Sequence, residues 1–298
     1  AEDGIRDRLV TGVQTCALPI CAGKSWTVAN LIQTAVKVMP KSHIILLDLH
    51  GEYSGSNDVE NLEKAFSEAT ARYLDARELE IPYWLMTFGE LCDLFIDRSE
   101  FSAHNQLAAF RDAIVALKDE EGERLELPRV TIDTPIFFDL ARLRENIDDK
   151  NGLVTSTSTG KQVKGPLTGA FDNFLMRLDS RLGDIRYDFL FKPIVRNSSE
   201  SLHDLLRDFV GLGEPQRPIT VIDLSSVPFD VRPTVAAQIG RLAFEFNYWN
   251  PQYREFPLLL ICEEAHAYIP RGSDSQYEGS RKSMERIAKE GRKYGVGL

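Results

Sequence analysis

The sequence predicts an α/β fold, in which a core with a parallel sheet is split by a mainly helical insertion. Three short apolar runs carry the prediction: Ile-Ile-Leu-Leu-Asp-Leu at 44–49, Ile-Thr-Val-Ile-Asp-Leu at 219–224 and Pro-Leu-Leu-Leu-Ile-Cys at 257–262. None of the runs shows regular polar alternation, which is typical of strands that are buried on both faces of a parallel sheet. Helical patterns lie between and beside these strands, so the chain alternates the two element types that a layered α/β core requires.

The remaining elements follow from apolar periodicity. Apolar residues from Val28 to Met39 recur at helical spacing before Pro40, and a second helix is expected from Val235 to Tyr248. We expect the core to comprise residues 21–56 and 216–298. Residues 57–215 are expected to form the insertion, because helical periodicity recurs at 62–73, 88–96, 106–117 and 167–182.

The first twenty residues do not enter the fold prediction. They resemble a translated sequencing adapter, and a natural N-terminal extension is the alternative interpretation. At the other end, Gly-Val-Gly-Leu at 295–298 resembles the start of another buried strand. We therefore expect that the sequence is truncated at both ends.

Composition limits the classes of protein to which the chain could belong. The 298 residues are 43% hydrophobic and 27% charged, as in a globular protein, and no apolar run approaches the roughly 20 residues of a membrane-spanning helix. The four cysteines form no C-x-x-C pair, so neither a zinc site nor a disulfide framework is expected. A net charge of -10 argues against a protein that coats nucleic acid with its whole surface. We expect a cytoplasmic protein with no membrane association.

Gly23, Lys24 and Ser25, followed by a predicted helix, match the second half of the phosphate-binding motif G-x-x-x-x-G-K-[ST]. In this motif backbone amides and the lysine bind nucleotide phosphates, and the hydroxyl binds Mg²⁺. The first half departs from the motif, because Leu18 stands where the first glycine belongs and Pro19 lacks an amide donor. The three matching residues are a weak signal by themselves.

Glu263 and Glu264 give a stronger signal, because they directly follow the apolar run that ends at Cys262. Ligands of parallel sheets bind beyond the carboxyl ends of the strands. We expect Glu263 to hold the Mg²⁺ of a nucleotide and Glu264 to act as the catalytic base that polarises the attacking water. The alternative is a strand end that carries two solvated glutamates.

Two further segments are open to two interpretations. Asp48 ends a predicted strand, and its carboxylate could lie beside the phosphate loop, although Gly51 is equally typical of an ordinary turn. Arg292 belongs to a basic stretch at 281–293. That stretch could face DNA or the nucleotide of a neighbouring subunit, or it could be a solvated helix whose cations suit the helix dipole.

Together these segments resemble the HerA-like ATPases of the HerA/FtsK superfamily. The resemblance rests on the segments 23–25, 48–53, 263–266 and 289–295, and within the insertion on 81–85 and 184–191. It implies a RecA-like core in a hexameric ring that hydrolyses ATP with Mg²⁺ and moves double-stranded DNA through its centre. A ring of this kind contacts DNA only through a few pore loops, which is compatible with an acidic chain. A NurA-type nuclease or another effector would act beside it, in DNA-end processing or anti-phage defence.

The resemblance also implies roles for single residues. Gly23, Lys24 and Ser25 would bind the nucleotide, with Ser25 on the metal, and Asp48 would lie beside them. Arg292 would be an arginine finger that reaches the ATP of the neighbouring subunit. Two other interpretations remain: a nucleotide-binding scaffold or switch without motor activity, and a conjugation- or secretion-type ATPase with the same core.

Overall fold

The computed structural model describes residues 23–55, 64–155, 162–165, 167–269 and 278–298. The adapter-like segment 1–20 and the first half of the phosphate-binding motif lie outside the described residues.

A five-stranded sheet forms the core, in the order β2-β5-β1-β6-β7, and all of its neighbouring strands are parallel. Its strands are β1 (His43–Asp48), β2 (Ala71–Asp75), β5 (Ile219–Asp223), β6 (Leu258–Cys262) and β7 (Val296–Gly297). The three strands predicted from apolar runs are β1, β5 and β6, and the strand expected at the end of the sequence is β7. The predicted α/β fold with a parallel sheet is confirmed.

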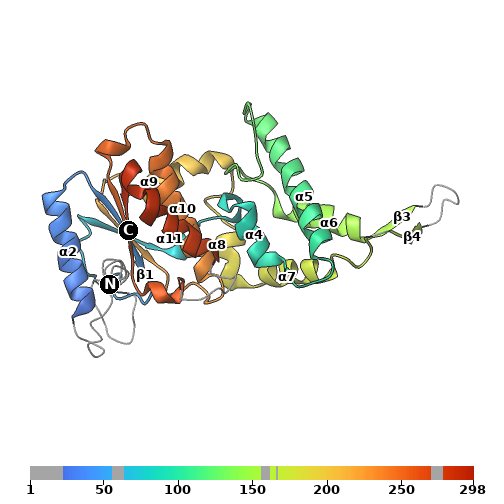
Figure 1. Ribbon diagram of the computed structural model, residues 1–298, viewed down its shortest axis with the longest axis horizontal. Coiled ribbons are helices and arrows are strands. Elements are labelled where there is room, and N and C mark those ends of the chain that lie inside the picture. The colour runs from blue at the N-terminus through green and yellow to red at the C-terminus, as the bar shows by residue number, and fades with distance from the viewer. Residues whose placement is uncertain (1–22, 56–63, 156–161, 166, 270–277) are drawn as a thin grey trace, which may run out of the picture.

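Helices cover both faces of the sheet, so its strands need apolar residues on both sides. On one face Ile44 and Leu46 pack with α2 (Lys24–Val38). On the other face Ile45 and Leu47 share a core with α10 (Arg232–Trp249) and α11 (Glu278–Glu290). Figure 1 shows α2 on the opposite side of the sheet from α10 and α11. This two-sided burial explains why β1 is a continuous apolar run.

The insertion extends from one side of the sheet and is mainly helical (Figure 1). Its helices gather around an aromatic cluster in which Phe110 and Phe174 lie 5.2 Å apart between ring centroids, with Phe95 beside both. Within the described ranges, no helix has the length and hydropathy needed to cross a membrane. The elements of the insertion are α3 (Ala76–Leu79), η1 (Tyr83–Leu85), α4 (Phe88–Phe95), α5 (Ala103–Arg124), α6 (Leu140–Asn151), β3 (Leu153–Thr155), β4 (Gln162–Lys164), α7 (Asp172–Gly183), η2 (Ile185–Tyr187), α8 (Asp188–Phe191), η3 (Ser199–Ser201) and α9 (Leu202–Phe209).

One predicted helix is wrong. The periodicity at 62–73 predicted a helix, but among the described residues 64–70 form turns and Tyr73 lies in strand β2, which pairs with β5. Four of the five residues of β2 are only partly buried, as expected at the edge of a sheet, so the strand lacks a continuous apolar run. The core therefore includes a strand from within the predicted insertion 57–215.

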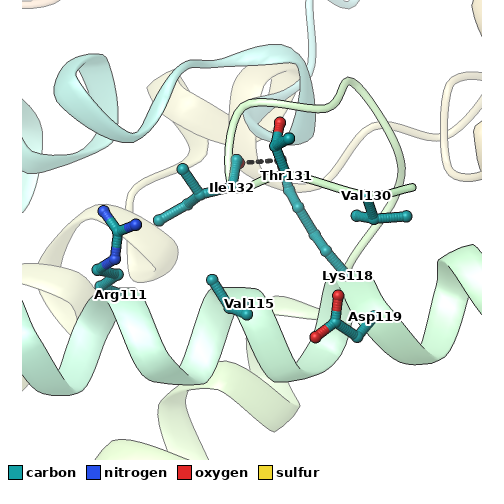
Figure 2. A pocket seen from close by; sticks show the side chains of 7 residues that line it. All are labelled: Arg111, Val115, Lys118, Asp119, Val130, Thr131 and Ile132. Carbon is teal, nitrogen blue, oxygen red and sulfur yellow. Dashed lines mark hydrogen bonds between the residues drawn. The ribbon is translucent and has the colours of Figure 1, made fainter.

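A buried lysine organises part of the insertion. Lys118 of α5 is fully buried, and its ammonium donates hydrogen bonds of 2.7 Å to the carbonyls of Ile132 and Thr134. Burial lowers the pKa of Lys118 to about 8. Lys118 lines a pocket of about 290 Å³. Figure 2 shows its side chain between α5 and the segment 130–132. Since Asp133 accepts the amide of Phe88 at the start of α4, Lys118 also helps to fix that helix.

Candidate nucleotide-binding site

The residues predicted to bind nucleotide meet at the carboxyl edge of the sheet. Strands β1 and β6 are parallel neighbours with Leu47 opposite Cys262, so Asp48 and Glu263 leave the sheet side by side. Helix α2 begins at this edge with Lys24. The lysine Nζ lies 3.6 Å from Oε1 of Glu264. Lys24 and Glu264, which are 240 residues apart in sequence, therefore face one another.

Gly23 shapes the start of α2. Its φ is +72°, in the left-handed region that glycine adopts without steric cost, and it stands at the N-cap position. The first amides of α2 are therefore free of intrahelical partners at the point where the Lys24 side chain emerges. Such a helix start attracts phosphate, because its unpaired amides and the helix dipole both favour negative charge.

Glu264 has an unusual backbone conformation, with φ 45° and ψ 42°. A residue with a Cβ in this left-handed region costs on the order of 1–3 kcal/mol, and such strain is common at functional sites. The turn directs the carboxylate toward Lys24 on one side, and its other oxygen lies 3.1 Å from Nδ1 of His266. About a third of the Glu264 side chain is exposed, so water and substrate can reach it.

Glu263 lies deeper than Glu264 and lacks compensating charge. Its Oε2 is enclosed and has no hydrogen-bond partner. Burial raises the pKa of Glu263 to about 8, and the nearby carboxylates of Asp48 and Glu52 add to the effect. Fully buried Tyr268 fixes the backbone here, because its hydroxyl donates 2.7 Å to the carbonyl of Glu263.

These features fit a divalent cation, which would supply the missing positive charge. Among the described residues, no group of three or more His, Cys, Asp or Glu side chains could hold a metal by itself. Mg²⁺ usually takes one or two protein oxygens together with phosphates and waters. Glu263 and the Ser25 hydroxyl would be such ligands for a nucleotide-bound metal.

Asp48 differs from the expectation that it contacts the nucleotide. Its side chain is fully buried and accepts the backbone amides of Glu52, Tyr53 and Ser54 at 3.0, 2.9 and 2.8 Å. Burial, the largest effect, raises its pKa. Since both oxygens are used within the protein, Asp48 shapes the turn after β1 instead of facing a ligand.

That turn brings two side chains to the site that the sequence did not single out. The Ser25 hydroxyl donates a hydrogen bond to Oε2 of Glu52. The hydroxyl of Tyr53, a buried residue, also lies beside Ser25 and Glu263. Burial raises the pKa of Tyr53, the nearby Glu263 carboxylate raises it further, and the contact with Ser25 lowers it. The signal was present in the Asp-Leu-His-Gly-Glu-Tyr segment, but the sequence alone does not show which carboxylate of a turn faces outward.

Arg292 lies near the amino-terminal ends of the strands, opposite the carboxyl ends that carry Glu263 and face Lys24. It is exposed in the turn η7 (Gly291–Tyr294), and the next residue, Gly295, accepts the amide of Leu258 at the start of β6. Glu263 follows the opposite end of β6, about 16 Å away at 3.3 Å per residue. The structure therefore does not bring Arg292 to the Lys24 site of the same chain.

Comparison with known proteins assigns the chain to a family. The model of the family described as "Helicase HerA, central domain" matches residues 22–243. The chain belongs to this family. The matched residues include strands β1, β2 and β5 and the whole insertion, so the predicted resemblance to the HerA family is confirmed.

Curated relatives support the assignment across most of the chain. A protein of Sulfolobus acidocaldarius named "DNA double-strand break repair helicase HerA" is 25% identical over 283 residues, or 93% of this chain and 48% of the relative. A probable helicase of Methanocaldococcus jannaschii is also 25% identical, over 93% of this chain and 46% of the relative. The chain thus spans about half the length of the curated relatives it matches.

Among solved structures, VirB4 of Thermoanaerobacter pseudethanolicus shares the fold. The TM-score is 0.55 at 16% identity, and the match covers 92% of this chain and 91% of VirB4. The two chains therefore share an overall fold across most of their length.

Proposed function

We propose that this HerA-family chain is the motor part of an ATP-hydrolysing translocase for double-stranded DNA. The observation that carries the proposal is the meeting of Lys24 with Glu263 and Glu264 at one edge of a parallel sheet. A phosphate-binding helix start, a metal-binding carboxylate and an accessible second carboxylate are the parts that hydrolysis of a triphosphate requires. The names of the relatives supply the DNA substrate.

Each residue has a defined role in this proposal. Gly23, Lys24 and the first amides of α2 hold the phosphates, and Ser25 and Glu263 hold the metal. When held there, Mg²⁺ would offset the phosphate charge during transfer. Glu264 orients the attacking water and accepts its proton. Lys24 lies 3.6 Å from Glu264, so the lysine that would contact the phosphates is next to the proposed base.

ATP hydrolysis, measured with and without double-stranded DNA, tests these roles. We expect Glu264→Gln to lower kcat by about 10²–10⁴-fold while nucleotide binding is retained, because the variant loses only the base. Lys24→Ala should lose nucleotide binding. Lys64→Ala is the matched control, since Lys64 is an exposed lysine paired with Glu68 outside the site. Unchanged turnover in the Glu264→Gln chain would refute the assigned base.

We further propose a homo-hexamer in which Arg292 reaches the nucleotide of the neighbouring subunit. This proposal is supported by the exposed position of Arg292 at the edge of the sheet opposite Lys24, where contact with ATP requires a second chain. Mixing Arg292→Ala with Glu264→Gln subunits tests it, because some interfaces then combine an intact base with an intact arginine. No recovery of activity in the mixture would contradict a role between subunits. The proposal also includes a cytoplasmic setting and a NurA-type nuclease or other effector as partner, which copurification would examine.

A conjugation- or secretion-type ATPase is the second candidate, because the fold likeness to VirB4 extends over most of both chains. The two candidates differ in how their ATP hydrolysis is expected to respond to DNA. Stimulation of ATP hydrolysis by linear double-stranded DNA favours the translocase, whereas hydrolysis that is indifferent to DNA favours the second candidate. Tight ATP binding without any hydrolysis would instead indicate a nucleotide-binding switch.

A further inference from the structure

The turn that follows β1, residues 51–54, has more contacts with the site than a connecting loop requires. Three of its amides are held by Asp48. Its far end is held by Ser54, whose hydroxyl donates 3.0 Å to Oδ2 of Asp223 on the neighbouring strand β5. Because Asp48 and Asp223 lie opposite one another in the sheet, two adjacent strands fix the turn. Its side chains are therefore rigidly placed.

Within this turn, the side chain of Glu52 is directed to the hydroxyl of Ser25. The hydroxyl of Ser25 donates its proton to Oε2 of Glu52, which is 27 residues away in sequence. A serine hydroxyl has one proton and two lone pairs, so a hydroxyl that offers a lone pair to a cation must direct its proton elsewhere. The side-chain oxygen of Glu52 is an acceptor in that other direction. The hydrogen bond seen here leaves the lone pairs of Ser25 available.

The neighbouring Tyr53 packs beside the same serine from within the core. Its ring is buried and stacks with Phe66, at 6.4 Å between centroids, in the layer beneath α2. Its hydroxyl lies beside Ser25 and Glu263, the two residues assigned to the metal. One turn thus contacts both of the metal ligands in the proposed site.

We propose that Glu52 is a positioning residue for the metal: it accepts the proton of Ser25 and so directs the serine lone pair toward nucleotide-bound Mg²⁺. The proposal rests on the proposed function, because it requires Ser25 to be a metal ligand. Partners that lie behind a metal ligand fix its orientation, and losing one typically costs 10–100-fold in metal affinity. The sequence segment 48–53 then acts as a unit, in which Asp48 folds the turn and Glu52 orients the serine.

Equilibrium binding of a fluorescent ATP analogue, with Mg²⁺ and with EDTA, tests the proposal without relying on hydrolysis. We expect Mg²⁺ to strengthen binding by the unsubstituted chain, and we expect this enhancement to fall 10–100-fold in Glu52→Ala. Binding in EDTA should stay within about twofold, because phosphate contacts of Lys24 and the α2 amides do not involve Glu52. Glu52→Gln should recover most of the enhancement, since its amide oxygen can still accept the serine proton.

Glu68→Gln is the matched control, because Glu68 is an exposed glutamate that pairs with Lys64 away from the site. A full Mg²⁺ enhancement in Glu52→Ala would overturn the proposal while leaving the proposed function intact. An equal loss of binding in Mg²⁺ and in EDTA would also overturn it, because Glu52 would then only maintain the loop. Absence of nucleotide binding by the unsubstituted chain would instead refute the proposed function itself.

Discussion

Without a cation, ionised Glu263 would be a buried charge with no partner, so Glu263→Gln is expected to stabilise the chain at alkaline pH. Its Oε2 is enclosed without a hydrogen-bond partner, and Asp48 and Glu52 lie nearby. Glutamine has nearly the same shape and no charge. The substitution therefore removes the energetic cost of ionising a buried carboxyl group, together with a proposed metal ligand.

The magnitude follows from the pKa of Glu263. The pKa is about 8 in the folded chain, against 4.5 as the ordinary value. Between these values the folded chain holds a proton that the unfolded chain has released, so the free energy of unfolding falls as pH rises. Between about pH 5.5 and pH 8.5 the expected fall is about 3 kcal/mol, and the glutamine variant lacks this contribution.

Urea denaturation in EDTA measures the difference at both pH values. The advantage of Glu263→Gln over the unsubstituted chain should be about 3 kcal/mol larger at pH 8.5 than at pH 5.5. Glu68→Gln controls for general effects of removing a negative charge, because Glu68 is exposed. With Mg²⁺ and ATP present, ligand binding should stabilise the unsubstituted chain more than the variant.

Two results would refute the reasoning. A stability difference between the two chains that does not change with pH would show that Glu263 is ionised in the folded state at all pH values tested. Equal stabilisation of both chains by Mg²⁺ and ATP would show that Glu263 does not hold the metal.

Three other predictions follow from the same structure. Glu264→Gly should raise the free energy of unfolding by about 1 kcal/mol in urea, because glycine adopts positive φ without strain, and should abolish ATP hydrolysis; lower stability would contradict this. Lys118→Met should cost about 2–4 kcal/mol, since two buried carbonyls lose their donor, and an unchanged urea midpoint would refute that role. Burial raises the pKa of both Cys92 and Cys262 to about 12, so peptide mass spectrometry should find neither alkylated in the folded chain at pH 7.5; rapid labelling would contradict the raised pKa values.

The sequence predicted most of the fold because its strands are buried on both faces. Strands β1, β5 and β6 are continuous apolar runs, and helix α10 extends over the predicted segment 235–248. The pattern failed at β2, whose partly exposed residues carry no such run. An edge strand is stabilised by backbone pairing with its neighbour, and backbone hydrogen bonds leave no mark on residue type.

Residue chemistry and strand ends were enough for the sequence to determine the candidate site in outline. A glycine, lysine and serine before a helix, and two glutamates after a buried strand, already placed both groups at one edge of a parallel sheet. Only the tertiary structure decided the direction of each side chain. In the structure, Asp48 is buried and accepts three backbone amides, and the side chain of Glu52 accepts the Ser25 hydroxyl. Arg292 lies near the opposite ends of the strands. These outcomes depend on contacts between segments far apart in the chain, whereas sequence patterns report only on neighbours.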